Sequence, residues 1–214
     1  MNINSLEYYN NLFNEAYINA ILRDWRKNEK FKYRDNPNRW EAPDGEEQLV
    51  DTHVRSLLWD KFQNKVIHIL DMGCGNGRTI KLIKNKNRHV IGIDFSKEAI
   101  KLAQENNPNI QDYIFECDIR NTAFFDKSFD VVLGLGSFEH LEKIDFSEPR
   151  RLVRDDGLFI VALPEEQISH GLTYDDGSHY EWKLTKEDWI KELEKFNFKV
   201  IQYMWHWIYV CQPV

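Results

Sequence analysis

The stretch ILDMGCGNGR, from Ile69 to Arg78, decides the fold of this 214-residue chain. An apolar run typical of a buried strand is followed at once by three glycines at alternate positions, and then by a helical pattern. Glycine allows a positive φ and a close approach of the backbone to a ligand, and the helix behind it presents free N–H groups and the positive end of its dipole. The loop therefore predicts a site for a polar group, although a glycine triplet alone is also compatible with a plain tight connection.

Around this loop, short aliphatic runs alternate with helical segments from Val66 onward. Such alternation is typical of βαβ units and predicts a parallel sheet. The expected strands are 66–71, 89–94, 111–117, 129–134 and 157–163, followed by two strands within the run 198–211 that turn near Trp205 and His206. The expected helices include 97–106, which Ser96 caps, and 186–196, which opens with Thr185 and Asp188.

The first 60 residues have a helical pattern, and we expect them to form an N-terminal cap or lid on a single compact domain of residues 61–214. One helix is expected along the apolar stripe that begins at Leu6 and ends at Ala20. A loop over 33–45 follows, and Asp44 with Glu47 predicts the start of a second helix.

Composition narrows the classes of partner. Apolar residues make up 42% and charged residues 29% of the chain, as in ordinary globular proteins, whereas a net charge of −7 disfavours nucleic acid. We therefore expect a small-molecule partner for a monomer or homodimer. Cys74, Cys117 and Cys211 form no CxxC pair, which argues against a disulfide framework or a structural zinc site. The sequence contains no targeting segment and no apolar run of transmembrane length, so we expect a cytoplasmic protein without a membrane partner.

A second motif, VIGID at 90–94, ends the next expected strand in an acid, and this Asp94 follows Gly75 by 19 residues. A carboxylate at the end of the second strand, beside the loop of the first, is placed to accept hydrogen bonds from both hydroxyls of a ribose. This geometry fits adenosine. Asp94 could instead cap the helix that begins at Lys97, but Ser96 already offers a capping group.

Two further motifs follow the third and fourth expected strands. The segment ECDI at 116–119 offers an acid that can accept from an adenine amino group, with an apolar neighbour to cover the ring, although an exposed loop acid explains it equally well. The segment FDVVLGLGSFEHL at 129–141 is a buried strand that opens into small residues and then into a polar helix start. The end of the fourth strand flanks the switch point of such a sheet, so we expect a substrate to meet a cofactor there.

Together these motifs resemble the class I S-adenosylmethionine-dependent methyltransferases, especially the small-molecule group that shares the loop LDxGCGxG. The resemblance runs from about Lys65 to Pro164. It implies an α/β, Rossmann-like, seven-stranded and mostly parallel sheet in the order 3-2-1-4-5-7-6, with the last strand antiparallel, and S-adenosyl-L-methionine as the methyl donor. Two departures stand out, because the last two strands run together without a marked turn and the usual Lys-Pro-Gly-Gly before the fifth strand appears as RDDG at 154–157, a variant turn.

By position, the resemblance implies donor-binding residues around the carboxyl ends of the first four strands. The residues implied are Asp71, Gly73, Cys74 and Gly75 for the methionine moiety, Asp94 for the ribose, Phe95, Asp118 and Ile119 for the adenine, and Leu135 beside the donor. Arg55, on the second N-terminal helix, is a further candidate for pairing with the donor's carboxylate, as is Arg39.

Two other functions remain open at this point. An NAD(P)-dependent Rossmann oxidoreductase also has a glycine-rich loop followed by a ribose-binding acid, but its fingerprint is GxGxxG/A. Gly73, Gly75 and Gly77 instead make GxGxG, and position 78 is Arg. A non-catalytic subunit could use the same fold for assembly, although an intact glycine loop with Asp94 argues against it.

On the acceptor side, methyl transfer to an oxygen or nitrogen atom needs alignment, and a base only where a hydroxyl or a protonated amine must lose a proton. Two histidines are candidate bases, His140, expected one turn into the helix after the fourth strand, and His179, in a long irregular stretch over 164–184. His140 could instead be structural or contact the donor, and His179 could be a substrate contact or merely structural. Loose spacing of the acids and histidines in that stretch predicts no metal site. The sequence does not identify the acceptor.

Overall fold

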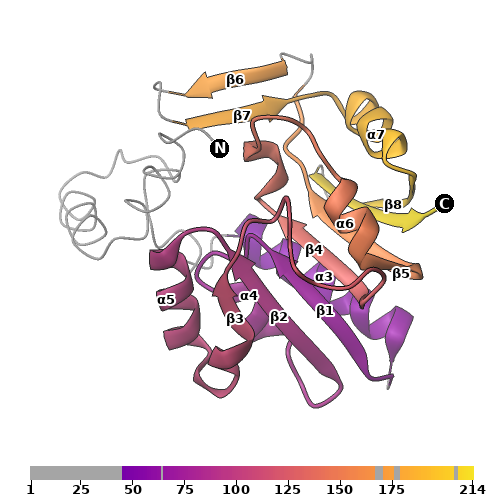
Figure 1. The fold of residues 1–214 in the computed structure, drawn as a ribbon. Coiled ribbons are helices and arrows are strands. Elements are labelled where there is room, and N and C mark those ends of the chain that lie inside the picture. The colour runs from indigo at the N-terminus through magenta and orange to yellow at the C-terminus, as the bar shows by residue number, and fades with distance from the viewer. Residues whose placement is uncertain (1–44, 64, 167–170, 176–178, 205–206) are drawn as a thin grey trace.

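The computed structural model describes residues 45–63, 65–166, 171–175, 179–204 and 207–214, and at their centre lies a seven-stranded sheet (Figure 1). The sheet order is β3-β2-β1-β4-β5-β9-β8. Its strands are β1 (Ile67–Met72), β2 (Arg88–Asp94), β3 (Ile114–Glu116), β4 (Phe129–Leu135), β5 (Val153–Ala162), β8 (Phe198–Met204) and β9 (Ile208–Pro213). A separate two-stranded hairpin consists of β6 (Gly171–Asp175) and β7 (His179–Lys183).

The strand directions confirm the predicted topology. Strands β1 to β5 are mutually parallel, and β9 is antiparallel to both of its neighbours, β5 and β8. Because β8 and β9 are the sixth and seventh strands of this sheet along the chain, the order corresponds to the expected 3-2-1-4-5-7-6 with the last strand antiparallel. The expected turn at Trp205 and His206 lies outside the described residues, and β8 and β9 end and begin on either side of it.

Helices cover both faces of the sheet, as alternating side chains on each strand require. The helices are α3 (Gly45–Phe62), α4 (Arg78–Ile83), α5 (Lys97–Asn106), α6 (Ser147–Leu152) and α7 (Lys186–Lys195), with 3-10 turns η2 (Pro108–Tyr113) and η3 (Phe138–His140). One core cluster joins α3, α4 and α5 to residues such as Ile69, Leu133 and Ile160, and the other joins η3, α6 and α7 to their strand neighbours Leu70, Val132 and Phe159. Figure 1 shows α6 on the near side of the sheet and α3 behind it.

Two predicted helix starts are confirmed by their capping bonds. The Ser96 side chain accepts from the backbone N–H of Ala99 at the start of α5, and the Thr185 side chain accepts from that of Asp188 at the start of α7. The second N-terminal helix also forms, as α3, and the first lies outside the described residues, together with Asp44. The proposed boundary at residue 60 falls within α3, whose buried Val54 and Leu58 share a core with β1.

The structure corrects three expectations about the strands. The run 111–117 is only partly extended, because η2 occupies its first residues and β3 begins at Ile114. The RDDG segment 154–157 lies inside β5 rather than in a turn before it, since β5 starts at Val153 and pairs with β4 through a register shift. The stretch 164–184 is not irregular throughout, because β6 and β7 pair within it.

Among the helices of the described residues, none combines the length and the apolar character that a crossing of a bilayer requires.

Candidate functional site

The glycine loop between β1 and α4 adopts backbone conformations that favour glycine. Gly73, Gly75 and Gly77 have φ values of 78°, 52° and 75°. A Cβ on Gly73 would lie 2.5 Å from the Cβ of Ser137, and a Cβ on Gly77 would lie 2.6 Å from the Nδ2 of Asn107. Side chains are therefore disfavoured at Gly73 and Gly77 by space as well as by φ, and the loop is bare backbone at these positions.

Hydrogen bonds hold this loop against the strands on both sides of β1. The backbone N–H groups of Gly73 and Cys74 both donate to the Ile93 carbonyl, at 2.8 and 2.9 Å. On the other side, the Ser137 hydroxyl donates to the Met72 carbonyl at 2.9 Å. The loop thus lies where the carboxyl ends of β2, β1 and β4 meet, which is the binding edge of a doubly wound sheet.

Two neighbouring asparagines support the loop from behind, a role that sequence reasoning missed. The side chain of Asn107 donates to the Gly77 carbonyl at 3.0 Å, and that of Asn106 donates to the Asn76 carbonyl at 2.9 Å. From the sequence alone, Asn106 is only the last residue of the helix expected over 97–106, and Asn107 has no predicted role. The available signal was that Asn is short and can both donate and accept, which suits a residue that must satisfy the carbonyls of a tight loop.

Asp94 ends β2 with its side chain almost fully buried, at 7% exposure. Its Oδ2 accepts from the Gly75 N–H at 3.0 Å and its Oδ1 from the Ser96 N–H at 2.9 Å. Burial raises the pKa of Asp94, and hydrogen bonds from the backbone of Ser96, Gly75 and Phe95 oppose that rise. A carboxylate has about four acceptor positions, more than these three backbone groups occupy, so acceptor capacity remains for a ligand at the edge of the sheet.

The segment after β3 brings a second acid to the same edge. The Cys117 N–H donates to the Asp94 carbonyl at 2.9 Å, which places Asp118 and the buried Ile119 beside the end of β2. The guanidinium of Arg120 donates to both Asp118 oxygens, with its Nε 2.9 Å from Oδ1. The Arg120 side chain thereby lowers the pKa of Asp118, so that this carboxylate stays ionised.

Other residues predicted at the site lie near these acids. Asp71 is buried at the carboxyl end of β1, and Phe95 is half-buried directly after Asp94. Burial raises the pKa of the Cys74 thiol, and the negative charges of Asp94 and Asp71 raise it further, which places all three side chains within electrostatic reach of one another. Cys74 is therefore a buried neutral thiol rather than a reactive thiolate.

The end of β4 lies at the same edge of the sheet, next to the end of β1. Leu135 and Gly136, with a φ of 79°, lead to Ser137 and the short turn η3. His140 closes this 3-10 turn, so the expectation that it lies one turn into an α-helix is wrong. Its Nε2 is 3.7 Å from the Oε1 of Glu139, and the two side chains are 16% and 4% exposed.

The β6–β7 hairpin packs against η3, as Figure 1 also shows. The indole Nε1 of Trp182 in β7 donates to the Leu141 carbonyl at 2.8 Å. His179 is the first residue of β7 and pairs with Asp175, and its side chain lies outside the described residues. The structure therefore brings the β7 strand to the turn that carries His140.

Arg55 is not brought to this edge. It lies exposed on α3, and its positive charge acts on Arg88 and lowers the pKa of that guanidinium, after the larger effect of burial. Arg88 is the first residue of β2, at the edge of the sheet opposite Asp94. Arg39, the other candidate for the donor's carboxylate, lies outside the described residues.

The chain matches a family model described as a methyltransferase domain, over residues 70–161. The ubiquinone biosynthesis O-methyltransferase of Pelagibacter ubique is 26% identical over 210 residues, which cover 85% of each chain. A probable S-adenosylmethionine-dependent methyltransferase of Mycolicibacterium smegmatis is 32% identical over 98 residues, and there the match spans 37% of the relative's length.

Solved structures share the fold. The PH0226 protein of Pyrococcus horikoshii superposes with a TM-score of 0.65 at 21% identity, over 86% of this chain and 100% of that one. The 1,6-didemethyltoxoflavin-N1-methyltransferase of Burkholderia thailandensis, with bound 1,6-didemethyltoxoflavin and S-adenosylhomocysteine, has a TM-score of 0.63 at 17% identity, over 92% of this chain and 89% of that one.

The described residues fit an adenosyl donor, because a loop with glycine at three alternate positions faces a buried carboxylate that has acceptor capacity left. The sheet order places both at the edge where such folds bind nucleosides. Together with the match to the methyltransferase domain over residues 70–161, these features support a class I S-adenosylmethionine-dependent methyltransferase with S-adenosyl-L-methionine as its cofactor.

Proposed function

We propose that the chain transfers the methyl group of S-adenosylmethionine to an oxygen or nitrogen atom of a small-molecule acceptor, bound beside η3 and the β6–β7 hairpin. The observation that carries this proposal is the contact between the start of the glycine loop and the end of β4, where the Ser137 hydroxyl donates a hydrogen bond to the Met72 carbonyl. A donor on the loop would have its methyl group next to η3. His140 and Glu139 lie on that turn.

Two similar proteins support a small acceptor. One is named an O-methyltransferase of ubiquinone biosynthesis, and the other is an N1-methyltransferase with bound 1,6-didemethyltoxoflavin. The net charge of −7 adds that a polyanionic acceptor would be repelled at long range.

For the donor, we propose that the backbone of Gly73, Cys74 and Gly75, with Asp71, faces the methionine moiety. Asp94 accepts from the ribose hydroxyls through its remaining acceptor positions. In the proposed adenine pocket, Asp118 accepts from the amino group, Phe95 and Ile119 cover the ring, and Leu135 lies beside the donor.

The donor supplies an electrophilic methyl carbon on a sulfonium, so the protein contributes mainly alignment and exclusion of water. Positioning can lower such a barrier by roughly 7–11 kcal/mol in favourable cases. His140 is the proposed base for a hydroxyl or a protonated amine, and the Glu139 carboxylate at 3.7 Å would stabilise the imidazolium that forms. His179 is the second candidate base.

Binding calorimetry tests the donor and the reaction class together. S-adenosylhomocysteine should bind with measurable heat and raise the melting temperature, whereas NADH and NADPH should do neither. Incubation of the protein with S-adenosylmethionine and a panel of phenols, catechols, amines and N-heterocycles should then release S-adenosylhomocysteine with some members only. Binding of a nicotinamide cofactor instead would support the oxidoreductase, and binding of neither would support a non-catalytic subunit.

A further inference from the structure

The segment 117–128, which joins β3 to β4, has to cross the sheet without regular structure of its own. Strands β3 and β4 are parallel and are separated in the sheet by β2 and β1, and such a crossover commonly contains a helix. Residues 117–128, all of them described, contain no helix or strand. Figure 1 shows this segment running across the front of the sheet. Its backbone groups therefore need partners from elsewhere.

A pair of charged residues on α6 supplies those partners. The Glu148 Oε1 accepts from the backbone N–H of Thr122 at 2.8 Å and from the Thr122 hydroxyl at 2.7 Å. The Arg151 Nη1 donates to the Phe124 carbonyl and to the Asp126 carboxylate, both at 2.7 Å. Thr122, Phe124 and Asp126 of the segment are thus all hydrogen-bonded to side chains of α6.

Arg151 and Glu148 are also bound to each other. The Arg151 Nε is 2.9 Å from Glu148 Oε2, and its Nη2 is 2.6 Å from Glu148 Oε1. This two-pronged pairing fixes the planes of both groups, which a single lysine could not do. Burial alone would raise the pKa of Glu148, but hydrogen bonds from Arg151 and Thr122 outweigh it and lower that pKa, so the pair remains charged.

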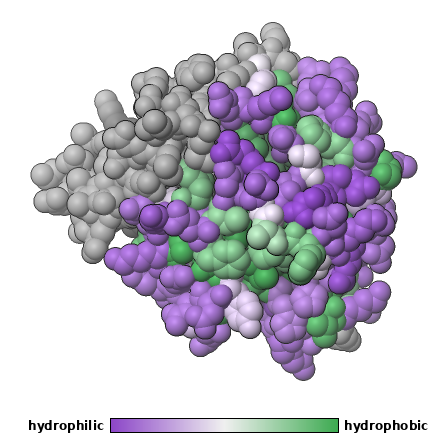
Figure 2. All heavy atoms as spheres, in the orientation of Figure 1, coloured by the Kyte–Doolittle hydropathy of each residue, from purple (hydrophilic) through white to green (hydrophobic). Residues whose placement is uncertain are grey.

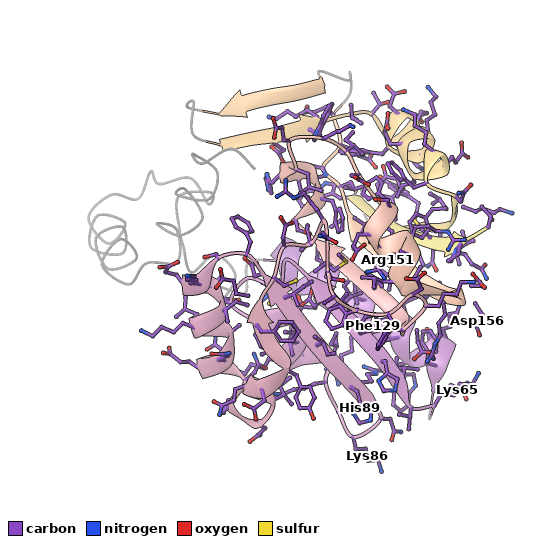
Figure 3. The ribbon with its side chains drawn as sticks, viewed as in Figure 1. Lys65, Lys86, His89, Phe129, Arg151 and Asp156 are labelled. Atoms are coloured by element: carbon purple, nitrogen blue, oxygen red, sulfur yellow. The ribbon has the colours of Figure 1, made fainter. Side chains whose placement is uncertain are left out.

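Aromatic packing holds the same segment without fixing its position along the sheet. The Phe124 ring lies 6.0 Å from that of Phe115 and 5.2 Å from that of Phe129. Figure 2 shows an apolar area on the face of the molecule that is turned toward the viewer, and Figure 3 labels Arg151 and Phe129 in the same view. The side chains of Phe115 and Phe125 are exposed. Apolar contacts are non-directional, so hydrogen bonds set the register of the segment: those of the Glu148 and Arg151 side chains at residues 122–126, and that of the Lys127 N–H to the Arg151 carbonyl at 2.9 Å.

Thr122, which Glu148 holds, lies close in the chain to the proposed adenine pocket. Thr122 follows Asp118 by four residues, and the turn between them is closed by bonds from Arg120 and Asn121 back to Asp118. A shift of Thr122 would therefore be passed to the Asp118 carboxylate.

We propose that Arg151 and Glu148 are positioning residues for base recognition, and that from α6 they hold Asp118 where it selects a 6-amino purine over a 6-oxo purine. The inference rests on the proposed contact of Asp118 with the adenine amino group. The carboxylate accepts a hydrogen bond from that amino group, but a 6-oxo group would face it with lone pairs instead. Selectivity therefore depends on how firmly the carboxylate is held.

The test compares dissociation constants of S-adenosylhomocysteine and S-inosylhomocysteine, measured by calorimetry. The wild-type protein should prefer the adenosyl compound by about tenfold or more, as expected for one hydrogen bond to a charged group. Arg151→Ala should reduce this ratio several-fold, and Arg151→Lys should restore part of it. General loosening of the fold would weaken both ligands equally and leave the ratio unchanged.

The neighbouring arginine provides a matched control. Arg150 lies on the same helix and donates to the Val214 carbonyl instead of the segment 117–128, so Arg150→Ala should keep the wild-type ratio. Thr122→Val removes the hydroxyl bond to Glu148 and the 3.4 Å bond that this hydroxyl accepts from Arg151, but keeps the backbone bond to Glu148. It gives a milder variant if Arg151→Ala does not fold, and it should also lower the ratio.

Asp118→Asn distinguishes the proposed contact of Asp118 with adenine from the proposed positioning of Asp118 by α6. If this variant keeps the wild-type ratio, the adenine contact itself is wrong. If it abolishes the preference while folded Arg151 and Thr122 variants retain it in full, the inference about α6 is overturned and the adenine contact stands.

Discussion

Among single residues, Asp94 links the two loops of the site, because its buried carboxylate accepts hydrogen bonds from Gly75 after β1 and from Ser96 after β2. Replacing Asp94 with Asn keeps one acceptor oxygen but turns the other into a donor that faces an N–H group. We expect the dissociation constant of S-adenosylhomocysteine to rise by about 10- to 100-fold, measured by calorimetry. An unchanged constant would exclude Asp94 from donor binding.

The same residue predicts a pH dependence. The pKa of Asp94 is raised above the ordinary value of 3.8 by burial, and only the ionised carboxylate can accept from two hydroxyls. Donor affinity should therefore fall as the pH drops through a value above 3.8, while Asp118, with its lowered pKa, is still ionised. A calorimetric pH series on the wild type and on Asp94→Asn tests this, and the variant should lack that step.

His140 predicts a separation of binding from chemistry. If it serves as the base, His140→Gln should lower kcat by about 10²- to 10⁴-fold with the acceptor found by screening, and donor affinity should change little. His89→Ala is the control, since His89 is exposed on β2, stacked against His68, and is labelled in Figure 3 far from η3. Equal kcat values for wild type and His140→Gln would exclude His140 as the base and leave η3 only a role in aligning the acceptor.

At the scale of elements, the hairpin is tied to η3 through an indole. Trp182→Phe keeps most of the ring but removes the hydrogen bond from Nε1 to the Leu141 carbonyl. We expect kcat/KM for the acceptor to fall about three- to tenfold while the dissociation constant of the donor is retained. Trp59→Phe, at an exposed position on α3, controls for the loss of an indole. A loss of donor affinity in Trp182→Phe would contradict an acceptor-side role.

The elements around the proposed donor site could be predicted from sequence, whereas those around the proposed acceptor site could not. Local signals specify β1, β2, β4 and α5, because apolar runs, glycines and a Ser96 cap each act within a few residues. The β6–β7 hairpin lacks such signals, and its place depends on a distant partner, the Leu141 carbonyl. The RDDG segment was mistaken for a turn because its place in β5 depends on pairing with β4, which no local pattern records.

Site residues follow the same division. That Asp94 and the glycines share one edge of the sheet could be predicted, because their spacing is set by one βαβ unit. Arg55 was misplaced because α3 is long, and which end of the sheet a side chain on it approaches is decided by how Val54 and Leu58 pack. Arg151 carried no signal, since its partners Thr122 and Phe124 lie more than 25 residues away in the chain.

At the scale of the whole molecule, acid should destabilise the fold partly through Glu148. The folded-state pKa of Glu148 is below its ordinary 4.5, so its contribution to stability is present above pH 4.5 and is lost as the pH falls through the folded-state value. Asp94, with a raised pKa, acts in the opposite sense. Glu148→Gln should lower the free energy of unfolding at pH 7 by about 1–3 kcal/mol and flatten its decline toward pH 3 in urea titrations. A decline as steep as that of the wild type would assign acid sensitivity to other carboxylates.

The contact between Gly73 and Ser137 has a practical consequence for redesign. There is no room for even one methyl group between them. The glycine loop and the segment that leads to His140 therefore cannot be altered independently. An engineer seeking a bulkier acceptor should leave both positions intact and trim or graft β6 and β7, where new shapes can be tried without disturbing the donor.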